Sequence, residues 1–332
     1  MTELIKKLIK APGISGREEG ISKAIAEIVA PYVDEVYSDA LGNLIAKKNG
    51  TGKDKKKLMF AAHMDEIGFI ATFIEESGFV RFAPIGGINP VATAFSTVVF
   101  ESGISGVIVP DASTEKAELA TDKLYVDIGA KSRKEAEKKV KIGDYFMVTP
   151  SLTRLMGKRV AGRPFDDRIG AAILIESAKR LDKVNDDVYF VFTVQEEVGC
   201  RGAKTAAYAI APDYAIALDV TGTGDALGAK PMAVELGGGA AIKIKDSSVI
   251  CDAGVVKMLT SLAKEKKIKH QTEILLYGGT DTSSMQMAGA GCRAGALSIP
   301  TRYIHSGVET LDLGDVEACV ALCVEFVKAD KE

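Results

Sequence analysis

The chain has 332 residues, of which 47% are hydrophobic and 26% are charged, as is typical of a soluble globular protein with a sizeable core. Its formal net charge of −3 creates no field that would attract nucleic acid or an anionic membrane surface. No stretch approaches the roughly 18 apolar residues of a membrane span, and the segment MTELIKKLIKAPG has no secretion signal. We therefore expect a cytosolic protein whose five cysteines stay reduced.

The N-terminal segment alternates helical and strand patterns. Ser15 and Glu18 have the spacing of a capping box in front of ISKAIAEIV, which predicts a helix there. The apolar run KLMFA, residues 57–61, predicts a buried strand. His63 and Asp65 follow that strand directly, in the segment AAHMDEIG.

Residues 67–159 have a different sequence pattern, which predicts many strands and turns and few helices. Two hairpins are expected around the dipeptides Ser77-Gly78 and Ser102-Gly103, and KIGDYFMVTP predicts a further strand. A helix is expected only over SRKEAEKK, residues 132–139. We predict a small β-barrel domain inserted here, with a margin of about five residues or more at each boundary.

The remaining residues, 160–332, return to alternating helices and short apolar strands. The helical patterns include DRIGAAILIESAKRL and the closing DVEACVALCVEFVKA, and the strand patterns include VYFVFTV, YAIAL, TEILL and AGALSI. Such alternation favours an α/β fold with a mainly parallel sheet and helices on both faces. Residues 1–66 and 160–332 would together form this discontinuous domain.

Acids and histidines follow the predicted strands at the point where each strand ends. Ligands of open α/β sheets bind beyond the carboxyl ends of the strands, so these side chains are expected at one edge of the sheet. The residues concerned are His63, Asp65, Asp166, Asp167, Glu196, Glu197, Asp219 and His305.

Each of these signals alone has an ordinary structural explanation. Asp-Asp before a helix is usual N-cap chemistry, and adjacent glutamates are usually surface charge. However, clustered carboxylates repel one another, and a divalent cation would remove that cost. Imidazole with carboxylate suits zinc, cobalt or manganese. The spacing alone leaves the structural explanation and a metal site both open. In a metal site, one of Glu196 and Glu197 can be a ligand and the other a base.

At these positions the sequence resembles the M42 family of metallo-aminopeptidases over essentially the whole chain. The segments AAHMDEIGF, PFDDRIGAA, VFTVQEEVGCRGA, IALDVT and RYIHSGVET stand in the family's order. The resemblance implies a phosphorylase/hydrolase-like α/β catalytic domain interrupted by a small β-barrel dimerisation domain.

The resemblance also implies two divalent metal ions, zinc or cobalt with manganese as a further option, bridged by Asp166. The other ligands would be His63 and Asp219 for one ion, and Glu197 and His305 for the second. Glu196 would be the general base, and Asp65 would orient the His63 ring. Because neighbouring side chains of a strand point to opposite faces, we expect a turn at Gln195–Glu197 that lets both glutamates face the site.

The implied activity is removal of amino acids from the N-termini of short peptides. The implied assembly is a homo-oligomer of dimers that join into a tetrahedral dodecamer, and a dimer alone stays an alternative. Neither nucleic acid nor membrane is an expected partner. The loop YGGTDTSS, residues 277–284, either lines the pocket or forms a turn that caps a helix at Thr280 or Asp281.

Three rival functions are set against this one. A deacylase or dipeptidase could use the same scaffold and metals. A glycosidase needs two carboxylates roughly 5–9.5 Å apart across a sugar bond, which suits the adjacent Glu196 and Glu197 poorly. A non-catalytic module would have no evident use for an unligated acid at Glu196.

Overall fold

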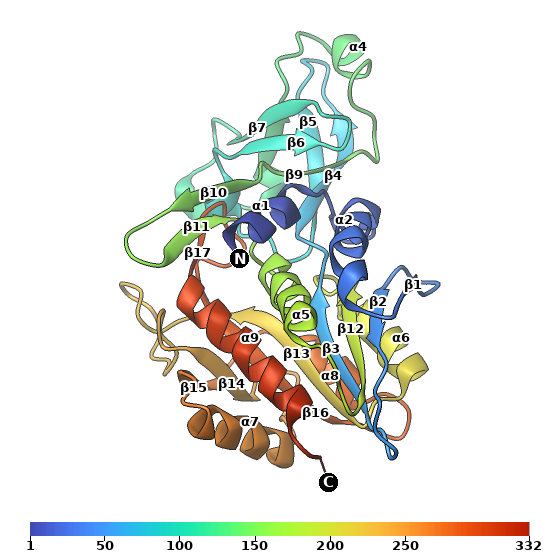
Figure 1. Ribbon diagram of the computed structural model, residues 1–332. Helices are drawn as coiled ribbons and strands as arrows, with labels where there is room; N and C mark the ends of the chain where they lie inside the picture. Colours follow the sequence, from blue (N-terminus) through green and yellow to red (C-terminus); the bar gives the residue numbers. More distant parts are fainter. Residues whose placement is uncertain (332) are drawn as a thin grey trace.

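The computed structural model, which describes residues 1–331, consists of a large mixed sheet covered by helices and a closed β-barrel (Figure 1). The barrel lies at one end of the molecule, beyond α1 and α2 (Figure 1). Within these residues, no helix combines the length and the apolar character that crossing a membrane requires.

The large sheet has 11 strands, with parallel pairs at its centre and mainly antiparallel pairs at its flanks. The parallel core runs in the order β12 (Asp187–Thr193), β3 (Lys57–His63), β13 (Tyr214–Thr221) and β16 (Arg293–Arg302). The flanking strands are β1 (Glu35–Ser38), β2 (Leu44–Lys48), β10 (Ser151–Arg154), β11 (Arg159–Arg163), β14 (Ala240–Lys245), β15 (His270–Ile274) and β17 (Glu309–Asp312). Among these flanking strands, only β14 and β15 pair parallel.

Helices cover both faces of this sheet because its central strands are apolar on both sides. Along β3, Leu58 and Phe60 belong to one hydrophobic cluster, and Met59 and Ala61 belong to another. The first cluster packs against α1 (Thr2–Lys10), α2 (Glu19–Val29), α5 (Arg168–Arg180), α7 (Ala253–Glu265) and α9 (Leu313–Lys328). The second packs against α6 (Arg201–Ile210) and α8 (Asp281–Gln286).

The barrel closes in the order β4-β5-β8-β7-β6-β9 around its own apolar core. Its strands are β4 (Gly68–Ile74), β5 (Val80–Ile85), β6 (Thr97–Phe100), β7 (Ser105–Pro110), β8 (Leu124–Asp127) and β9 (Tyr145–Val148). Two short helices accompany them, α3 (Pro90–Thr93) and α4 (Arg133–Ala136). The barrel strands are contiguous in the sequence and pair only antiparallel.

The fold class predicted from the sequence is confirmed, including the barrel and the helices on both faces. The hairpin turn at Gly78 has φ +92°, and a Cβ there would lie 2.9 Å from the carbonyl oxygen of Ala130, so glycine is required. The helix expected over 132–139 is shorter, because α4 ends at Ala136 and turns follow. The division into domains at 66/67 and 159/160 stays a prediction; β10 pairs with β11 in the large sheet.

A buried ion cluster ties α1, the start of the barrel and α5 together. The Arg168 side chain, with 0% exposure, donates from Nη1 to the carbonyl oxygens of Leu8 and Ala11 at 2.7 Å each. Its Nη2 lies 3.0 Å from Glu66 Oε1, and Arg163 Nη2 lies 3.4 Å from Glu66 Oε2. Because Arg168 opens α5 directly after the Asp166-Asp167 pair, this cluster also fixes that part of the backbone.

Replacement of Arg168 by methionine is expected to lower the free energy of unfolding by about 3–5 kcal/mol. Methionine keeps much of the apolar volume but removes the buried guanidinium, so Glu66 Oε1 and the carbonyl oxygens of Leu8 and Ala11 lose its hydrogen bonds. Urea denaturation followed by circular dichroism measures the change. Arg180→Met on the same helix is the control, because Arg180 pairs with the half-exposed Glu317 and should cost about 1 kcal/mol or less. Equal losses in the two variants would contradict the role of the buried cluster.

Candidate metal centre

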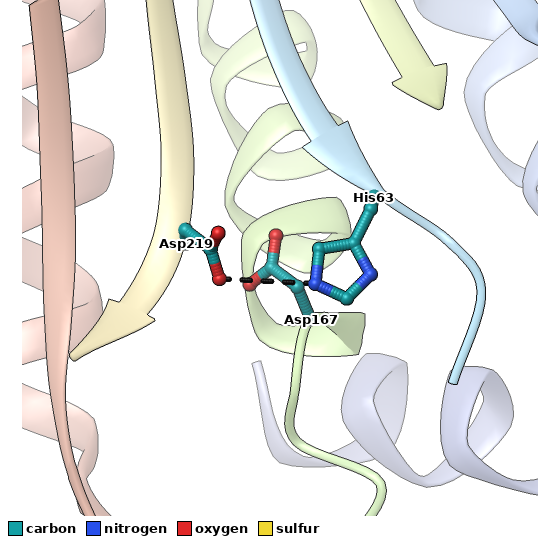
Figure 2. A group of neighbouring side chains, drawn as sticks. All are labelled: His63, Asp167 and Asp219. Carbon is teal, nitrogen blue, oxygen red and sulfur yellow. Dashed lines mark ion pairs between the residues drawn. The ribbon is translucent and has the colours of Figure 1, made fainter. Parts of the chain in front are cut away.

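The carboxyl ends of the parallel strands bring the predicted acids and histidines to one place. β3 ends at His63, β13 supplies Asp219 near its end, and β16 is followed by the turn that holds His305. Asp166 and Asp167 arrive between β11 and α5. Figure 2 shows the side chains of His63, Asp167 and Asp219 converging from three of these elements.

Asp166 lies between the two histidines. Its Oδ1 is 3.0 Å from Nε2 of His63, and its Oδ2 is 3.2 Å from Nε2 of His305. Beyond the imidazoles, Asp219 Oδ1 lies 3.7 Å from His63 Nε2, and Glu197 Oε1 lies 3.2 Å from His305 Nε2. One carboxylate therefore joins two groups, each made of one histidine and one further acid.

Asp167 is the second acid of the pair and has a different environment. Its Oδ1 accepts from the Gly170 N–H at 2.9 Å and caps α5, while its buried Oδ2 has no hydrogen-bond partner. Its ligand atoms also lie within 4.8 Å of those of His63 and Asp219 (Figure 2). The helix-capping explanation thus applies to Asp167, and Asp166 is the acid that contacts both imidazoles.

The backbone after β12 turns so that both glutamates reach the site. The strand ends at Thr193, and Gln195 has φ +55°, as the turn expected at Gln195–Glu197 requires. The Asp65 carboxylate accepts hydrogen bonds from the N–H groups of Glu196 at 3.0 Å and Glu197 at 3.3 Å. These bonds fix the turn, and both glutamate side chains then line the same cavity.

Asp65 also contacts the His63 ring. Nδ1 of His63 lies 3.0 Å from the Asp65 carbonyl oxygen and 3.6 Å from its carboxylate Oδ1. These contacts leave Nε2 of His63 directed toward Asp166. The sequence predicted only the contact with the imidazole, whereas Asp65 holds the glutamate turn as well.

The buried charges at this site strongly perturb one another. Burial raises the pKa of Glu196 well above its usual range and also raises the pKa values of Glu197 and Asp219. Burial lowers the pKa of His305, but its close contacts with the carboxylates of Asp166 and Glu197 outweigh burial and raise that pKa to about 11. The side chains thus need protons or cations to balance the negative charge gathered here.

The donor set fits divalent metal ions. It combines two imidazole nitrogens with carboxylate oxygens, a mixture that suits zinc, cobalt or manganese better than calcium or magnesium. The Glu197 Oε1 atom is buried and has no partner with hydrogen-bond geometry, and the same holds for Asp167 Oδ2 and Asp281 Oδ1. Buried carboxylate oxygens without donors are costly unless a cation binds them.

Several residues that shape the site were missed in the sequence. Glu309 accepts from the N–H groups of Phe165, Asp166 and His305. It therefore fixes the backbone of the two segments that carry Asp166 and His305. Its only sequence signal is its place four residues after His305. The capping box expected at Ser15 and Glu18 is wrong. The Ser15 hydroxyl donates to Asp65, and Glu18 Oε1 accepts from the Gln195 N–H.

A cavity of about 700 Å³ opens beside the acids and His305. The carboxyl ends of β13 and β16, together with the loops that follow β13, β15 and β16, supply most of its lining. Tyr277, Gly278 and Gly279 line this cavity, and the Thr280 hydroxyl caps α8. Both explanations of the loop YGGTDTSS therefore hold for different residues of it.

Comparison with known proteins gives consistent matches over nearly the whole chain. A model of the M42 glutamyl aminopeptidase family matches residues 42–322. A candidate aminopeptidase of Acetivibrio thermocellus is 47% identical, with 98% of each chain covered. The lysyl aminopeptidase of Pyrococcus furiosus is 37% identical over 96% of this chain and 94% of its own. The solved TET1 peptidase of Pyrococcus horikoshii, which can assemble into a tetrahedron or a large octahedral shell, is 37% identical, with a TM-score of 0.89 and 99% of each chain covered.

Replacement of Asp166 by alanine is expected to abolish binding of divalent ions at both histidines, because one carboxylate faces both imidazoles. The metal content of the purified variant, measured by mass spectrometry, should fall toward zero. Asp187→Ala is the matched control, since Asp187 stands at the opposite end of β12 and pairs with Lys55. A variant without Asp166 that still holds two ions per chain would contradict the bridging arrangement.

Proposed function

The chain belongs to the M42 family of glutamyl aminopeptidases and hydrolyses peptide bonds, and on this basis we propose that it removes single residues from the N-termini of short peptides with two divalent ions. The family is metal-dependent. Zinc or cobalt, with manganese as a further option, suits the side chains at the strand ends.

The observation that carries this proposal is the position of Asp166 between His63 and His305. A carboxylate that presents one oxygen to each imidazole can bridge two cations. His63 and Asp219 would complete the ligands of one ion, and Glu197 and His305 would complete those of the other. Bound divalent ions would lower the pKa of a water and polarise the carbonyl of the scissile bond.

Glu196 is the acid left over to move protons. Its carboxylate lies 3.9 Å from His63 Nε2, and the Cys200 thiol donates to its Oε1 at 3.2 Å. Its side chain is buried but lines the cavity, so it meets both substrate and water there. Glu196 would take a proton from the attacking water and pass it to the leaving amine. Asp65 is a positioning residue, because it holds the backbone N–H of Glu196.

A preference for free N-termini follows from the acids at this edge of the cavity. A free α-amine could bind there, either protonated against the carboxylates or as a ligand of a metal ion. An acetylated amine carries no positive charge and is a poor metal ligand, so it would gain neither interaction. A deacylase on the same scaffold would need the opposite preference.

We also propose that the chain forms homo-oligomers, with dimers joined into a tetrahedral dodecamer. The assemblies of the TET1 peptidase support this proposal. The barrel exposes large apolar side chains, with Phe95 77% and Val91 69% exposed, and such surfaces favour association. An enclosed assembly would admit short peptides and exclude folded proteins.

Activity is expected to depend on added metal and on a free α-amine. A chelator-stripped sample should lose hydrolysis of aminoacyl-p-nitroanilides and regain it with zinc, cobalt or manganese ions. N-acetylated aminoacyl-p-nitroanilides should not be hydrolysed under the same conditions. Hydrolysis of acetylated substrates only, or full activity in the stripped sample, would contradict the proposed function.

Glu196→Gln is expected to keep both ions and to lower kcat by about 10²–10⁴-fold, because glutamine cannot accept the proton. Metal analysis and steady-state kinetics test the two parts separately. The adjacent variant Glu197→Gln is the matched control, since it removes a charge one residue away and should lose metal. Metal loss in Glu196→Gln with retention in Glu197→Gln would show that ligand and base are exchanged.

A further inference from the structure

Outside the metal centre, the lining of the adjacent cavity offers almost no unpaired charge that could bind a charged substrate side chain. Apolar and aromatic side chains, among them Val220, Leu275, Tyr277 and Ile304, alternate with glycines and threonines in its lining. In the part of the chain that the structure describes, Arg302 is the one cationic side chain in this lining apart from His305 of the metal centre. The acids in the lining all belong to the metal centre.

The charge of Arg302 is already compensated by Asp225. Nε of Arg302 lies 3.0 Å from Oδ1 of Asp225, and Nη2 lies 2.6 Å from Oδ2, so the pair is bidentate. The two side chains are only 18% and 23% exposed. Asp225 also accepts from the Leu236 N–H at 3.2 Å within the connection from β13 to β14, and its bonds with Arg302 join this connection to the end of β16.

Both members of this pair are ionised at neutral pH. Partial burial raises the pKa of Asp225, but the hydrogen bond from Arg302 outweighs it and lowers that pKa to about 2. Lys230, which lies outside the lining, has its Nζ 5.9 Å from the centre of the Tyr277 ring and is exposed to water, so its field is screened. A charged substrate side chain would therefore lose hydration in the cavity without gaining a free opposite charge.

From this geometry we infer that the cavity accepts an uncharged, apolar side chain of the first substrate residue, and that the Arg302–Asp225 pair excludes acidic and basic ones. This inference rests on the proposed aminopeptidase function. An apolar side chain buries its surface against Leu275 and Ile304 and meets no unpaired charge. If one partner of the pair were removed, the remaining charge would attract a substrate side chain of the opposite sign.

The first experiment compares kcat/KM of the metal-loaded enzyme on the p-nitroanilides of leucine, glutamate and lysine. The leucine substrate should exceed both charged ones by at least about tenfold, because burial of an unpaired charge costs more than loss of apolar contact. A higher kcat/KM for glutamate or lysine would overturn the inference while leaving the aminopeptidase function intact.

Two variants test the ion pair through shifts of opposite sign. Asp225→Asn frees the Arg302 charge and should lower the leucine-to-glutamate ratio of kcat/KM by about tenfold. Arg302→Met frees the Asp225 charge and should lower the leucine-to-lysine ratio by a similar factor. Damage to the loop alone would reduce all three substrates together, and that result would overturn the role of the pair.

Asp111→Asn is the matched control. Asp111 forms a similar pair with Arg81 in the barrel, with both oxygens 3.2 Å from Arg81 Nη1, and its loss should leave the substrate ratios unchanged. If no aminoacyl substrate is hydrolysed, the proposed function fails. Calorimetric binding of free leucine, glutamate and lysine to the metal-loaded chain then decides the inference: tightest binding of leucine supports it, and tighter binding of a charged amino acid overturns it.

Discussion

Repulsion between buried carboxylates at the ends of the parallel strands is the constraint on which the rest of the site depends. Asp166, Glu196, Glu197 and Asp219 are within reach of two histidines, and the backbone would not hold them there without compensation. Part of that compensation is supplied by main-chain donors. Asp65 and Glu309 accept N–H groups from the very segments that carry the acids, so acids at the periphery of the site hold the acids at its centre in place.

The acids form an inner layer at the centre of the site and an outer layer at its periphery. The outer layer explains how several carboxylates can lie close together in fixed positions. Of the inner acids, Asp166, Glu197 and Asp219 would offer oxygens to cations, and the outer acids Asp65 and Glu309 are satisfied by backbone hydrogen bonds. Buried ions tie the outer layer to the core, because Glu66 follows Asp65 directly and binds Arg163 and Arg168. A change of charge in the outer layer would therefore move the inner acids without touching a metal ion.

The inner layer could be predicted from the sequence because each of its residues stands at a recognisable boundary. His63, Glu196, Glu197 and Asp219 stand at or near the ends of apolar runs, and strand ends meet at one edge. The barrel was predictable because Gly78 and Gly103 mark its hairpins. Of the outer layer only Asp65 was predicted, because nothing in the sequence around Glu309 or Glu18 indicates burial. Ser15 illustrates the limit: local spacing favoured a helix cap, whereas a contact with Asp65, fifty residues away, determines its place. The antiparallel pairs of β2 with β12 and of β11 with β17 likewise join strands that are far apart in the sequence.

The insertion of the barrel between His63 and Asp166 also has a consequence for how the chain matures. β3 lies between β12 and β13, so it has no sheet partners on either side until the ribosome has synthesised residues far beyond the barrel. The barrel strands, in contrast, run from Gly68 to Val148 without interruption and pair with one another. The barrel is thus a part of the nascent polypeptide that can fold before β3 gains its partners in the sheet. The edge that gathers the acids and histidines is completed only when the segment around His305 emerges, so the site forms late in synthesis.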